Sequence, residues 1–282
     1  MRIHHLDCGT MCPLAGRLMG GRDLFGRGLM VCHCLLIETA RDGLVLIDTG
    51  FSTADCEDPR RLSAPFRVVT APRLARAQTA REQVRALGLD PIDVRHLIVT
   101  HMDLDHAGGI ADFPSATVHL HRRELDAARA RVTLKERNRY IPRQWQHHTR
   151  WNPVTETGDT WLGLPAVQKL AGLDADIALI PLHGHTHGHS GVVVRTEPGW
   201  ILHAGDAYFH HLELVEPLDA PVGLRVFQSA MQMDGRARHA SQATLRRLHR
   251  EHPEVTITSS HDPAELARFT RPIVADAQAR VA

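Results

Sequence analysis

The segment Thr100-His101-Met102-Asp103-Leu104-Asp105-His106-Ala107-Gly108-Gly109 carries two imidazoles and two carboxylates within six residues, directly after the apolar run Leu97-Ile98-Val99. Such a run is typical of a buried strand, and side chains of a loop that follows a strand can converge on one point. Histidine nitrogens together with carboxylate oxygens suit a divalent ion such as zinc, iron or manganese. The segment therefore predicts a metal site at the end of a strand.

Three further segments place a histidine or an aspartate directly after a short apolar run. They are Gly184-His185-Thr186-His187-Gly188-His189-Ser190, His203-Ala204-Gly205-Asp206-Ala207 and Ser259-Ser260-His261-Asp262-Pro263. The apolar runs before them cover residues 177–182, 200–202 and 255–257. Four strand ends would thus deliver ligands to one site, which is how a rigid scaffold assembles a metal centre.

This arrangement resembles the metallo-β-lactamase superfamily, whose signature is His-x-His-x-Asp-His, a distant His, a bridging Asp and a C-terminal His. The matching residues here are His101, Asp103, Asp105, His106, His185, Asp206 and His261. The surroundings of His185 and His261 are most similar to the N-acyl-homoserine lactonase branch. The resemblance covers about residues 30–265 and implies an α/β fold, a four-layer αββα sandwich that forms a single domain over residues 1–282.

The resemblance also implies how the ligands are shared between two divalent ions, with zinc expected first and iron or manganese as alternatives. The first ion would take His101, Asp103 and His185, the second would take Asp105, His106 and His261, and Asp206 would bridge them. A hydroxide held between the ions would attack a carbonyl carbon, and Asp105 would also steer or relay the proton.

Asp103 stands where the family has its second histidine. A carboxylate there adds negative charge, hardens the first metal position and lowers the Lewis acidity of its ion, which makes iron or manganese plausible beside zinc. Two alternatives stay open at this point: either Asp103 is a ligand and two ions bind, or Asp103 binds no metal and the site holds one ion.

Four other polar residues are candidates for a role beside the ligands. Tyr208 follows Asp206 by two residues and would hydrogen-bond the substrate carbonyl, although its offset is one residue shorter than in the lactonases; the alternative is a core tyrosine with a satisfied hydroxyl. His189 matches the family's second Gly-His and is expected to support the ligands, whereas His187 receives no role. Asp48 is expected to orient a ligating imidazole.

The site and the resemblance together predict a metallohydrolase that acts on ester bonds, first of all on a lactone ring such as that of an acyl-homoserine lactone, the reaction of quorum quenching. Thioester and phosphoester hydrolysis are alternatives on the same site. An alternative of another class is a mono- or di-iron oxidoreductase similar to the sulfur dioxygenases, which Asp103 keeps open. A metal-stabilised scaffold without activity agrees least with a complete ligand set.

The composition of the chain limits the classes of partner that it is expected to bind. The chain has 282 residues, 33 basic and 32 acidic, for a net charge of +1, and this balance disfavours a nucleic-acid surface. It contains no apolar stretch long enough to span a membrane, and no signal peptide is visible.

Five cysteines without an export signal predict reduced thiols and a cytoplasmic location. Cys32 and Cys34 should share one face of a strand, as buried packing or as part of a zinc site. The expected partner is a small-molecule substrate, with a homodimer possible.

Periodicity places the other elements. Hairpins are predicted from segments 31–39 with 44–49 and 192–196 with 200–203, and helices over 76–87, 122–137 and 241–251. Asp262 before Pro263 reads as a helix cap. The segment 138–164 has no clear period but holds Tyr140, Trp145, Trp151 and Trp161. It predicts a lid or substrate wall, with an insertion that packs its own rings or a dimer contact as alternatives.

Overall fold

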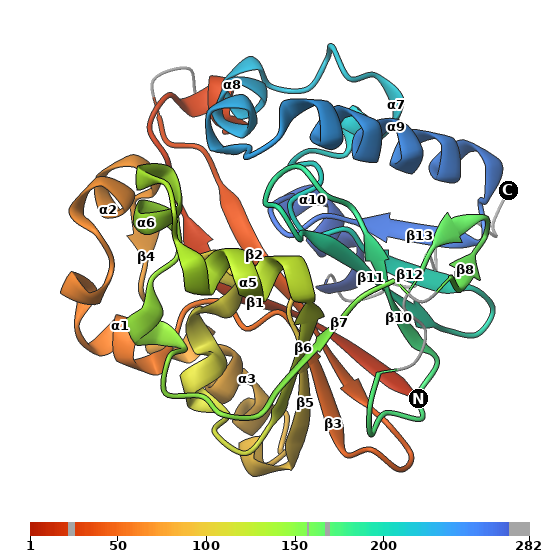
Figure 1. The fold of residues 1–282 in the computed structure, drawn as a ribbon. Helices are drawn as coiled ribbons and strands as arrows, with labels where there is room; N and C mark the ends of the chain where they lie inside the picture. The colour runs from red at the N-terminus through yellow and green to blue at the C-terminus, as the bar shows by residue number, and fades with distance from the viewer. Residues whose placement is uncertain (22–25, 157, 167–169, 271–282) are drawn as a thin grey trace, which may run out of the picture.

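The computed structural model describes residues 1–21, 26–156, 158–166 and 170–270, which form two β-sheets with helices on their outer faces (Figure 1). The first sheet has seven strands in the order β4-β1-β2-β3-β5-β6-β7, namely Pro72–Arg73, Arg2–Met11, Met30–Glu38, Leu44–Ile47, Val94–Ile98, Thr117–His121 and Trp151–Val154. The second has four strands in the order β10-β11-β12-β13, namely Ile177–Pro181, Ser190–Arg195, Trp200–His203 and Val255–Thr258. A small hairpin joins β8 (Thr160–Trp161) to β9 (Leu164–Pro165).

Among the described residues, ten α-helices connect and cover the strands. They are α1 (Thr53–Glu57), α2 (Ala64–Thr70), α3 (Ala80–Ala86), α4 (Leu104–Ala107), α5 (Arg122–Ala130), α6 (Leu134–Arg139), α7 (Leu212–Val215), α8 (Val222–Met231), α9 (Gly235–Glu251) and α10 (Pro263–Thr270). Within this part of the chain, no helix is both long and apolar enough to cross a membrane.

Each strand contributes to two apolar layers because its successive side chains point to opposite faces. Leu35 and Ile37 of β2 belong to the layer between the sheets, whereas Leu36 belongs to the layer beneath α3 and α5. In the second sheet, Leu179 of β10 faces the middle layer and Ile180 faces the layer beneath α9. The four-layer αββα sandwich that the resemblance implied is thereby confirmed.

Both predicted hairpins are present: β2 pairs with β3, and β11 with β12, in antiparallel register. The predicted helices have different limits. The helix expected from residue 76 begins at Ala80, because Thr79 caps it, and a single turn of 3-10 helix precedes it. The helix expected over 122–137 is two helices, because Arg131 adopts a left-handed conformation with φ of 45° and Thr133 starts α6. The helix expected over 241–251 corresponds to α9. It is longer than expected, since Asp234 caps it and it begins at Gly235.

The aromatic segment 138–164 is built into the fold. Tyr140 and Trp145 are buried in the core beneath the first sheet, and residues Trp151–Val154 form its edge strand β7. Among the described residues of the segment, only the first two line the pocket described below. The structure therefore supports a packing role for these rings and leaves the start of the segment to contact a substrate.

The cysteines of β2 also pack in the core. Cys32 and Cys34 are both buried, and no disulfide joins cysteines within the described residues. Burial raises the pKa of both thiols well above its ordinary value. Among the described residues, no candidate cluster of metal ligands includes a cysteine, which favours the packing alternative over a Cys/His zinc site.

Glu124 in α5 joins two loops that carry predicted ligands. Its Oε1 accepts a hydrogen bond from the backbone N–H of Met102 at 2.9 Å, and its Oε2 accepts one from the N–H of Gly188 at 3.0 Å. A Cβ on Gly188 would lie 2.2 Å from the backbone nitrogen of Glu124, so this approach requires glycine. The buried carboxylate thus holds the loop after β5 against the loop after β10.

We expect Glu124→Ala to destabilise the chain, because it leaves two backbone N–H groups without their acceptor at a cost of about 1–3 kcal/mol each. Chemical denaturation would measure the loss in the free energy of unfolding. Asp126→Ala, on the exposed side of the same helix, is the control and should change stability by less than about 0.5 kcal/mol. Equal effects of the two substitutions would contradict a tie between the loops.

Candidate metal centre

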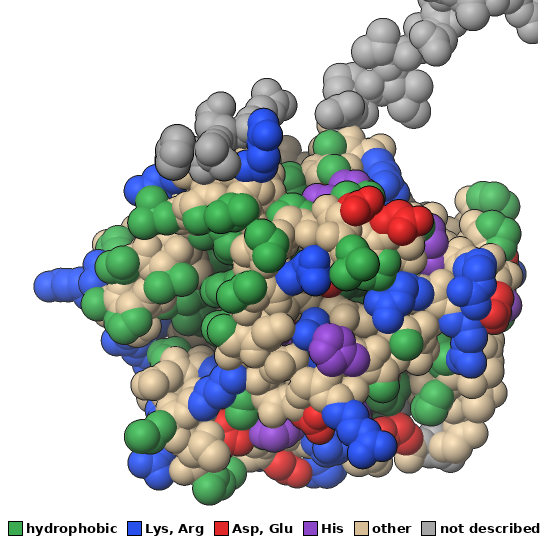
Figure 2. Space-filling view, turned by 90° about the horizontal axis from the view of Figure 1, so that it is seen from above, with side chains coloured by type: hydrophobic (Ala, Val, Ile, Leu, Met, Phe, Trp, Pro, Cys, Tyr) green, Lys and Arg blue, Asp and Glu red, His purple; other side chains and the backbone are tan. Residues whose placement is uncertain are grey.

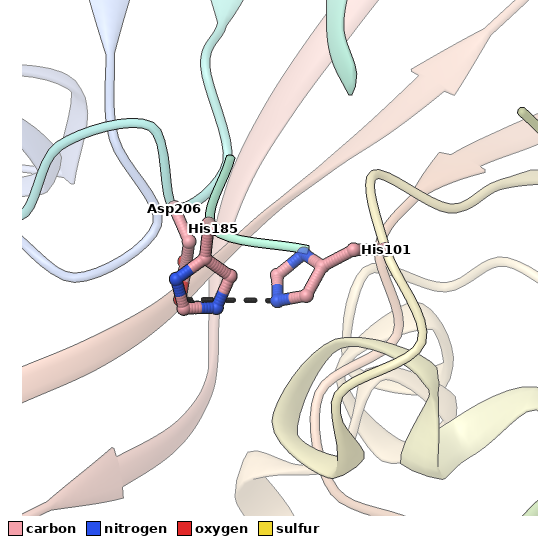
Figure 3. Close-up of side chains that lie close together, drawn as sticks. All are labelled: His101, His185 and Asp206. Atoms are coloured by element: carbon pink, nitrogen blue, oxygen red, sulfur yellow. Dashed lines mark ion pairs between the residues drawn. The ribbon is translucent and has the colours of Figure 1, made fainter. Parts of the chain in front are cut away.

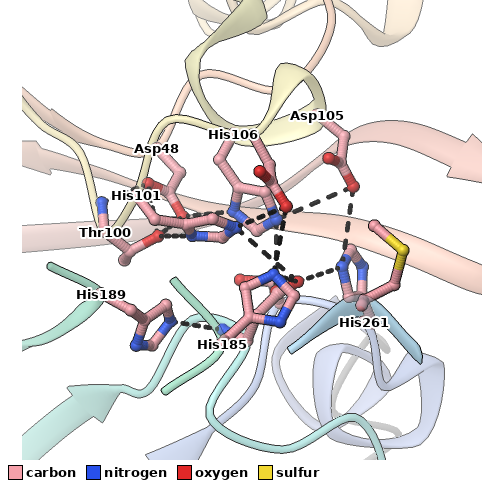
Figure 4. A network of polar contacts seen from close by, with 12 residues as sticks. Asp48, Thr100, His101, Asp105, His106, His185, His189 and His261 are labelled. Atoms are coloured by element: carbon pink, nitrogen blue, oxygen red, sulfur yellow. Dashed lines mark hydrogen bonds and ion pairs between the residues drawn. The ribbon is translucent and has the colours of Figure 1, made fainter. Parts of the chain in front are cut away.

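All seven predicted ligands meet where the loops after β5, β10, β12 and β13 come together. Ligand atoms of His101, His185 and Asp206 lie within 4.8 Å of one another (Figure 3). The same holds for a second cluster of Asp105, His106 and His261 (Figure 4). The ends of two sheets thus form one site from segments that are far apart in sequence.

Asp206 contacts both clusters. Its Oδ2 lies 3.3 Å from Nε2 of His185 and 3.1 Å from Nε2 of His261, and its Oδ1 lies 3.2 Å from Nε2 of His106. Nε2 of His101 is 3.8 Å from the same Oδ2. Asp206 therefore lies between the two clusters, in contact with a histidine of each.

Asp103 and Asp105 flank this bridge on opposite sides. Oδ2 of Asp103 lies 3.1 Å from Nε2 of His185 and 3.4 Å from Nε2 of His101, so Asp103 belongs with the first cluster. Oδ2 of Asp105 lies 3.6 Å from Nε2 of His261 and 3.7 Å from that of His106. Each cluster therefore has two imidazoles, a carboxylate of its own and a share of Asp206.

The donor set fits divalent cations. Nε2 of His101, Nε2 of His106 and Oδ1 of Asp206 are buried and have no hydrogen-bond partner among the described residues. A buried polar atom that makes no such bond costs about 1–3 kcal/mol, and three buried carboxylates repel one another. Cations held by these atoms would remove both costs. The spacing of two clusters around one carboxylate suits two ions, and nitrogen with oxygen donors suits zinc, iron or manganese.

Hydrogen bonds turn the imidazoles so that Nε2 faces the site. His106 donates from Nδ1 to Oδ2 of Asp48 at 2.9 Å, and His261 donates from Nδ1 to the carbonyl of Val31 at 2.8 Å. The ring of His101 is held through Oγ1 of Thr100, 3.0 Å from its Nδ1. Partners of this kind fix the tautomer of a metal-binding histidine and raise its basicity.

Asp48 supports the ring of His106 directly and the ring of His101 through Thr100. Its Oδ1 accepts the backbone N–H of Thr100 at 2.8 Å, and its Oδ2 accepts the Thr100 hydroxyl at 2.8 Å beside the bond from His106. Burial disfavours the charged carboxylate, yet His106 and His203 hold the pKa of Asp48 below its ordinary value. Asp48 thus holds the imidazole of His106, as predicted, and metal binding by that imidazole stays a prediction.

His189 supports the bridging residue and is not a ligand. It donates from Nδ1 to the carbonyl of Leu182 at 2.7 Å, and its Nε2 accepts the backbone N–H of Asp206 at 2.9 Å. Burial lowers the pKa of His189 well below its ordinary value, so the ring is neutral, as both hydrogen bonds require. Gly205 has φ of +55°, and a Cβ there would lie 2.7 Å from the same Nε2. His187 lies apart from the ligands, with its Nε2 3.3 Å from Oε1 of Glu136.

The structure does not bring Tyr208 to the metal centre. Its ring is buried in the core beneath α9, and its hydroxyl donates to Oε1 of Glu265 at 2.8 Å. Tyr208 is not among the residues that line the pocket, whereas the neighbouring Phe209 is. A hydrogen bond from Tyr208 to a substrate carbonyl is therefore inconsistent with this geometry, and the alternative of a core tyrosine with a satisfied hydroxyl holds.

The pocket over the metal centre has a polar floor and apolar walls. The walls consist of Met11, Met30, Phe66, Leu104, Phe209, Phe227 and Met231, with Thr70, Asn138 and Arg139 as further polar residues. Figure 2 shows hydrophobic side chains gathered on the side of the molecule where α2 and α8 lie, and Phe66 and Phe227 come from these two helices. The floor can therefore bind ions while the walls accept an apolar group.

Sequence reasoning missed two residues of this site, Arg139 and Glu124. Arg139 is buried, and its Nε lies 3.3 Å from Oδ1 of Asp103. It occurs in the segment predicted to be a lid, but no local pattern marked it. Glu124 lies on the buried face of an amphipathic helix, where a charged residue is an anomaly that could have been noticed.

A third cluster of possible ligands, His121, Glu156 and His183, lies outside this site. Nδ1 of His121 accepts the backbone N–H of Arg123 at 3.2 Å, so the proton of a neutral ring is on Nε2. That Nε2 lies 3.1 Å from Oε2 of Glu156 and donates to it. The hydrogen bond explains the cluster without a metal.

The buried carboxyl of Glu265 makes the stability of the fold depend on pH. Burial, and then the charge of Asp262, raise the pKa of Glu265 from 4.5 to about 7. Between these values the folded chain holds a proton that the unfolded chain releases, so stability falls as pH rises through this window.

Glu265→Gln has no such proton, and its stability should therefore not fall with pH in this window. Between about pH 5 and about pH 7.5, the free energy of unfolding of the wild type should fall by up to about 3 kcal/mol relative to the variant. Parallel pH curves in urea denaturation would contradict the assignment.

Comparison with known proteins agrees with the architecture. Residues 27–261 match the family model of the Metallo-beta-lactamase superfamily. A protein of Mycobacterium tuberculosis (strain ATCC 25618 / H37Rv) named "probable metallo-hydrolase" is 39% identical over 273 residues, 96% of this chain and 84% of that protein. The N-acyl homoserine lactonase AttM of Rhizobium johnstonii is 30% identical over 197 residues, 69% of this chain and 71% of the lactonase.

Among solved structures, an N-acyl homoserine lactone hydrolase with N-hexanoyl-L-homoserine bound at its catalytic metal centre has a TM-score of 0.70. The alignment covers 96% of each chain at 17% identity, which is a likeness of fold. The family match, the relatives and the converging histidines and aspartates lead to one conclusion: the chain belongs to the metallo-β-lactamase superfamily and is a metallo-hydrolase related to the lactonases.

Proposed function

We propose that this protein uses two divalent ions, zinc in the first instance, to open the ring of a lactone such as an acyl-homoserine lactone. The observation that carries the proposal is the position of Asp206 between two ligand clusters, at the floor of a pocket whose walls are apolar. Relatives named N-acyl homoserine lactonases support this choice of substrate class. Quorum quenching in the cytoplasm is part of the same proposal.

The pocket suits a substrate with a polar reacting group and an apolar chain. Two methionines and three phenylalanines line it, namely Met11, Met30, Phe66, Phe209 and Phe227. Methionine adapts to chains of different shape, and aromatic rings offer large apolar contact areas. Burying an acyl chain here would contribute about 25 cal/mol for each Å² of apolar surface removed from water. The acyl part of the substrate would therefore lie against these walls, with its ester group at the floor.

The residues of the floor have separate tasks in the proposed reaction. When bound, two divalent ions polarise the carbonyl and lower the pKa of a bound water to near neutrality. Asp206 holds the two positions at a constant separation through its contacts with His106 and His185. Asp105 is 8% exposed at the pocket, and its carboxylate can take a proton from the attacking water and direct it toward the leaving oxygen.

Thioester and phosphoester hydrolysis remain alternatives on the same ligands. Phosphoester binding is disfavoured because Arg139 is the sole lysine or arginine among the described residues that line the pocket. Two of its nitrogens donate to backbone carbonyls and the third faces Asp103, so no free cation awaits a phosphate. A single-iron oxidoreductase would use only one of the two ligand clusters. The presence of two clusters therefore favours a two-ion hydrolase over a single-iron enzyme. The homodimer stays a prediction.

The first test is the hydrolysis of a lactone panel that includes acyl-homoserine lactones of several chain lengths. The metal-loaded protein should open lactones, and faster for longer acyl chains, because of the apolar walls. The chelator-treated protein should be inactive and regain activity when zinc is added. If the metal-loaded protein opens no lactone but cleaves thioesters, the lactonase proposal is wrong and the hydrolase remains. Oxygen uptake by an iron-loaded protein would favour the oxidoreductase.

The metal content gives a second test. We expect two ions per chain in the wild type by elemental analysis. Asp206→Ala should lose at least one ion and lower kcat/KM by about a thousandfold or more, because Asp206 contacts both clusters. Asp219→Ala, at an exposed acidic residue, is the matched control and should retain both ions and full activity. Normal turnover by Asp206→Ala would rule out the bridging role.

A further inference from the structure

The carboxylate of Asp103 has two neighbours of different kinds. Its Oδ2 faces the first ligand cluster, 3.1 Å from Nε2 of His185 and 3.4 Å from Nε2 of His101. Its Oδ1 lies 3.3 Å from Nε of Arg139, an ion pair without a hydrogen bond. One oxygen is thus available to a metal ion while the other is paired with a positive charge.

Arg139 is held firmly in this place. It ends α6 (Leu134–Arg139) and is only 7% exposed. Its two terminal nitrogens donate to the carbonyl of His185 at 2.8 Å and to the carbonyl of Met231 at 2.6 Å. The planar guanidinium therefore connects the Asp103 loop, the His185 loop and the end of α8. A lysine could not reach these three acceptors in the same way, because its donors share one nitrogen whereas those of arginine are spread over a planar fork.

The charge of Asp103 needs this partner. An ionised carboxylate that is buried without a counter-charge costs several kcal/mol. No other lysine or arginine lies among the described pocket-lining residues. Arg139 is accordingly the one fixed cation of the pocket, and it is beside the carboxylate that replaces an imidazole.

We propose that Arg139 is a positioning residue of the metal centre, and that Asp103 and Arg139 act as one neutral ligand unit in the place of a histidine. Arg139 turns one oxygen of Asp103 toward the first metal position and cancels the charge that the carboxylate brings. The first ion then experiences no more negative charge than it would beside an imidazole. On this proposal Asp103 would leave the Lewis acidity of that ion unchanged, which differs from the expectation from sequence. The inference rests on the metal centre and not on the identity of the substrate.

The test is a double-mutant cycle on metal binding. Arg139→Met keeps the length of the side chain but removes its charge, and we expect the affinity of one Zn²⁺ to fall about 10- to 100-fold, the usual effect of losing a partner that orients a ligand. The other Zn²⁺ should stay bound. In Asp103→His the imidazole carries no charge, so Arg139→Met should then cost much less, and the double variant should bind Zn²⁺ more tightly than Arg139→Met alone. Competition with a chromogenic chelator measures these affinities.

Two further measurements separate positioning from simple loss of structure. The visible spectrum of the Co²⁺-loaded protein reports the geometry of the first position and should change in Arg139→Met, whereas thermal unfolding reports the fold. Arg137→Met, at an exposed arginine of the same helix, is the control and should leave the spectrum and both affinities unchanged. If Arg139→Met does not fold, Arg139→Lys takes its place in the cycle, with a loss again smaller in the Asp103→His background.

Two results would overturn the proposal. One is unchanged Zn²⁺ affinity and an unchanged Co²⁺ spectrum in Arg139→Met. The other is a loss of the same size with Asp103 and with Asp103→His, since Arg139 would then act independently of the carboxylate. All readouts concern metal binding, so a protein that opens no lactone would still decide this question.

Discussion

The carboxylate of Asp206 lies among imidazoles that come from three different loops, and the rest of the site is arranged around it. Its two oxygens are within 3.3 Å of His106, His185 and His261. A buried anion surrounded by ring nitrogens is favourable only if those rings are turned correctly and cations can enter. Both sheets end at this point, so the sandwich is what brings the histidines together.

The buried charged groups around the site each have a hydrogen-bonding or ion-pair partner. Asp48 accepts a hydrogen bond from Nδ1 of His106, Glu124 accepts hydrogen bonds from two backbone N–H groups, and Arg139 pairs with Asp103. Each of these charged groups would cost several kcal/mol if it were buried alone. Because each is paired, the loops that carry the ligands are held in place by the protein itself. A site preorganised in this way can bind ions without a large rearrangement.

Much of the fold followed from local pattern, and its errors have local causes. The hairpins were predicted because apolar alternation on both sides of a turn is a strong signal. The helix expected over 122–137 is divided because Arg131 adopts a left-handed conformation and Thr133 forms a capping box with Glu136. The periodicity of apolar residues continues across that break, so periodicity alone could not reveal it. The rings of Tyr140 and Trp145 fill the core, which a window of sequence cannot distinguish from a lid.

The sequence by itself determined which side chains could bind metal, because the type and order of donors after apolar runs are properties of single segments. It also carried the family, through motifs in a constant order. Only the tertiary structure decided that Arg139 neutralises Asp103 and that Tyr208 bonds Glu265 instead of a substrate. These outcomes depend on which segments meet and which way a side chain turns. Burial then sets the electrostatic cost of each charge, and burial is a property of the folded chain as a whole.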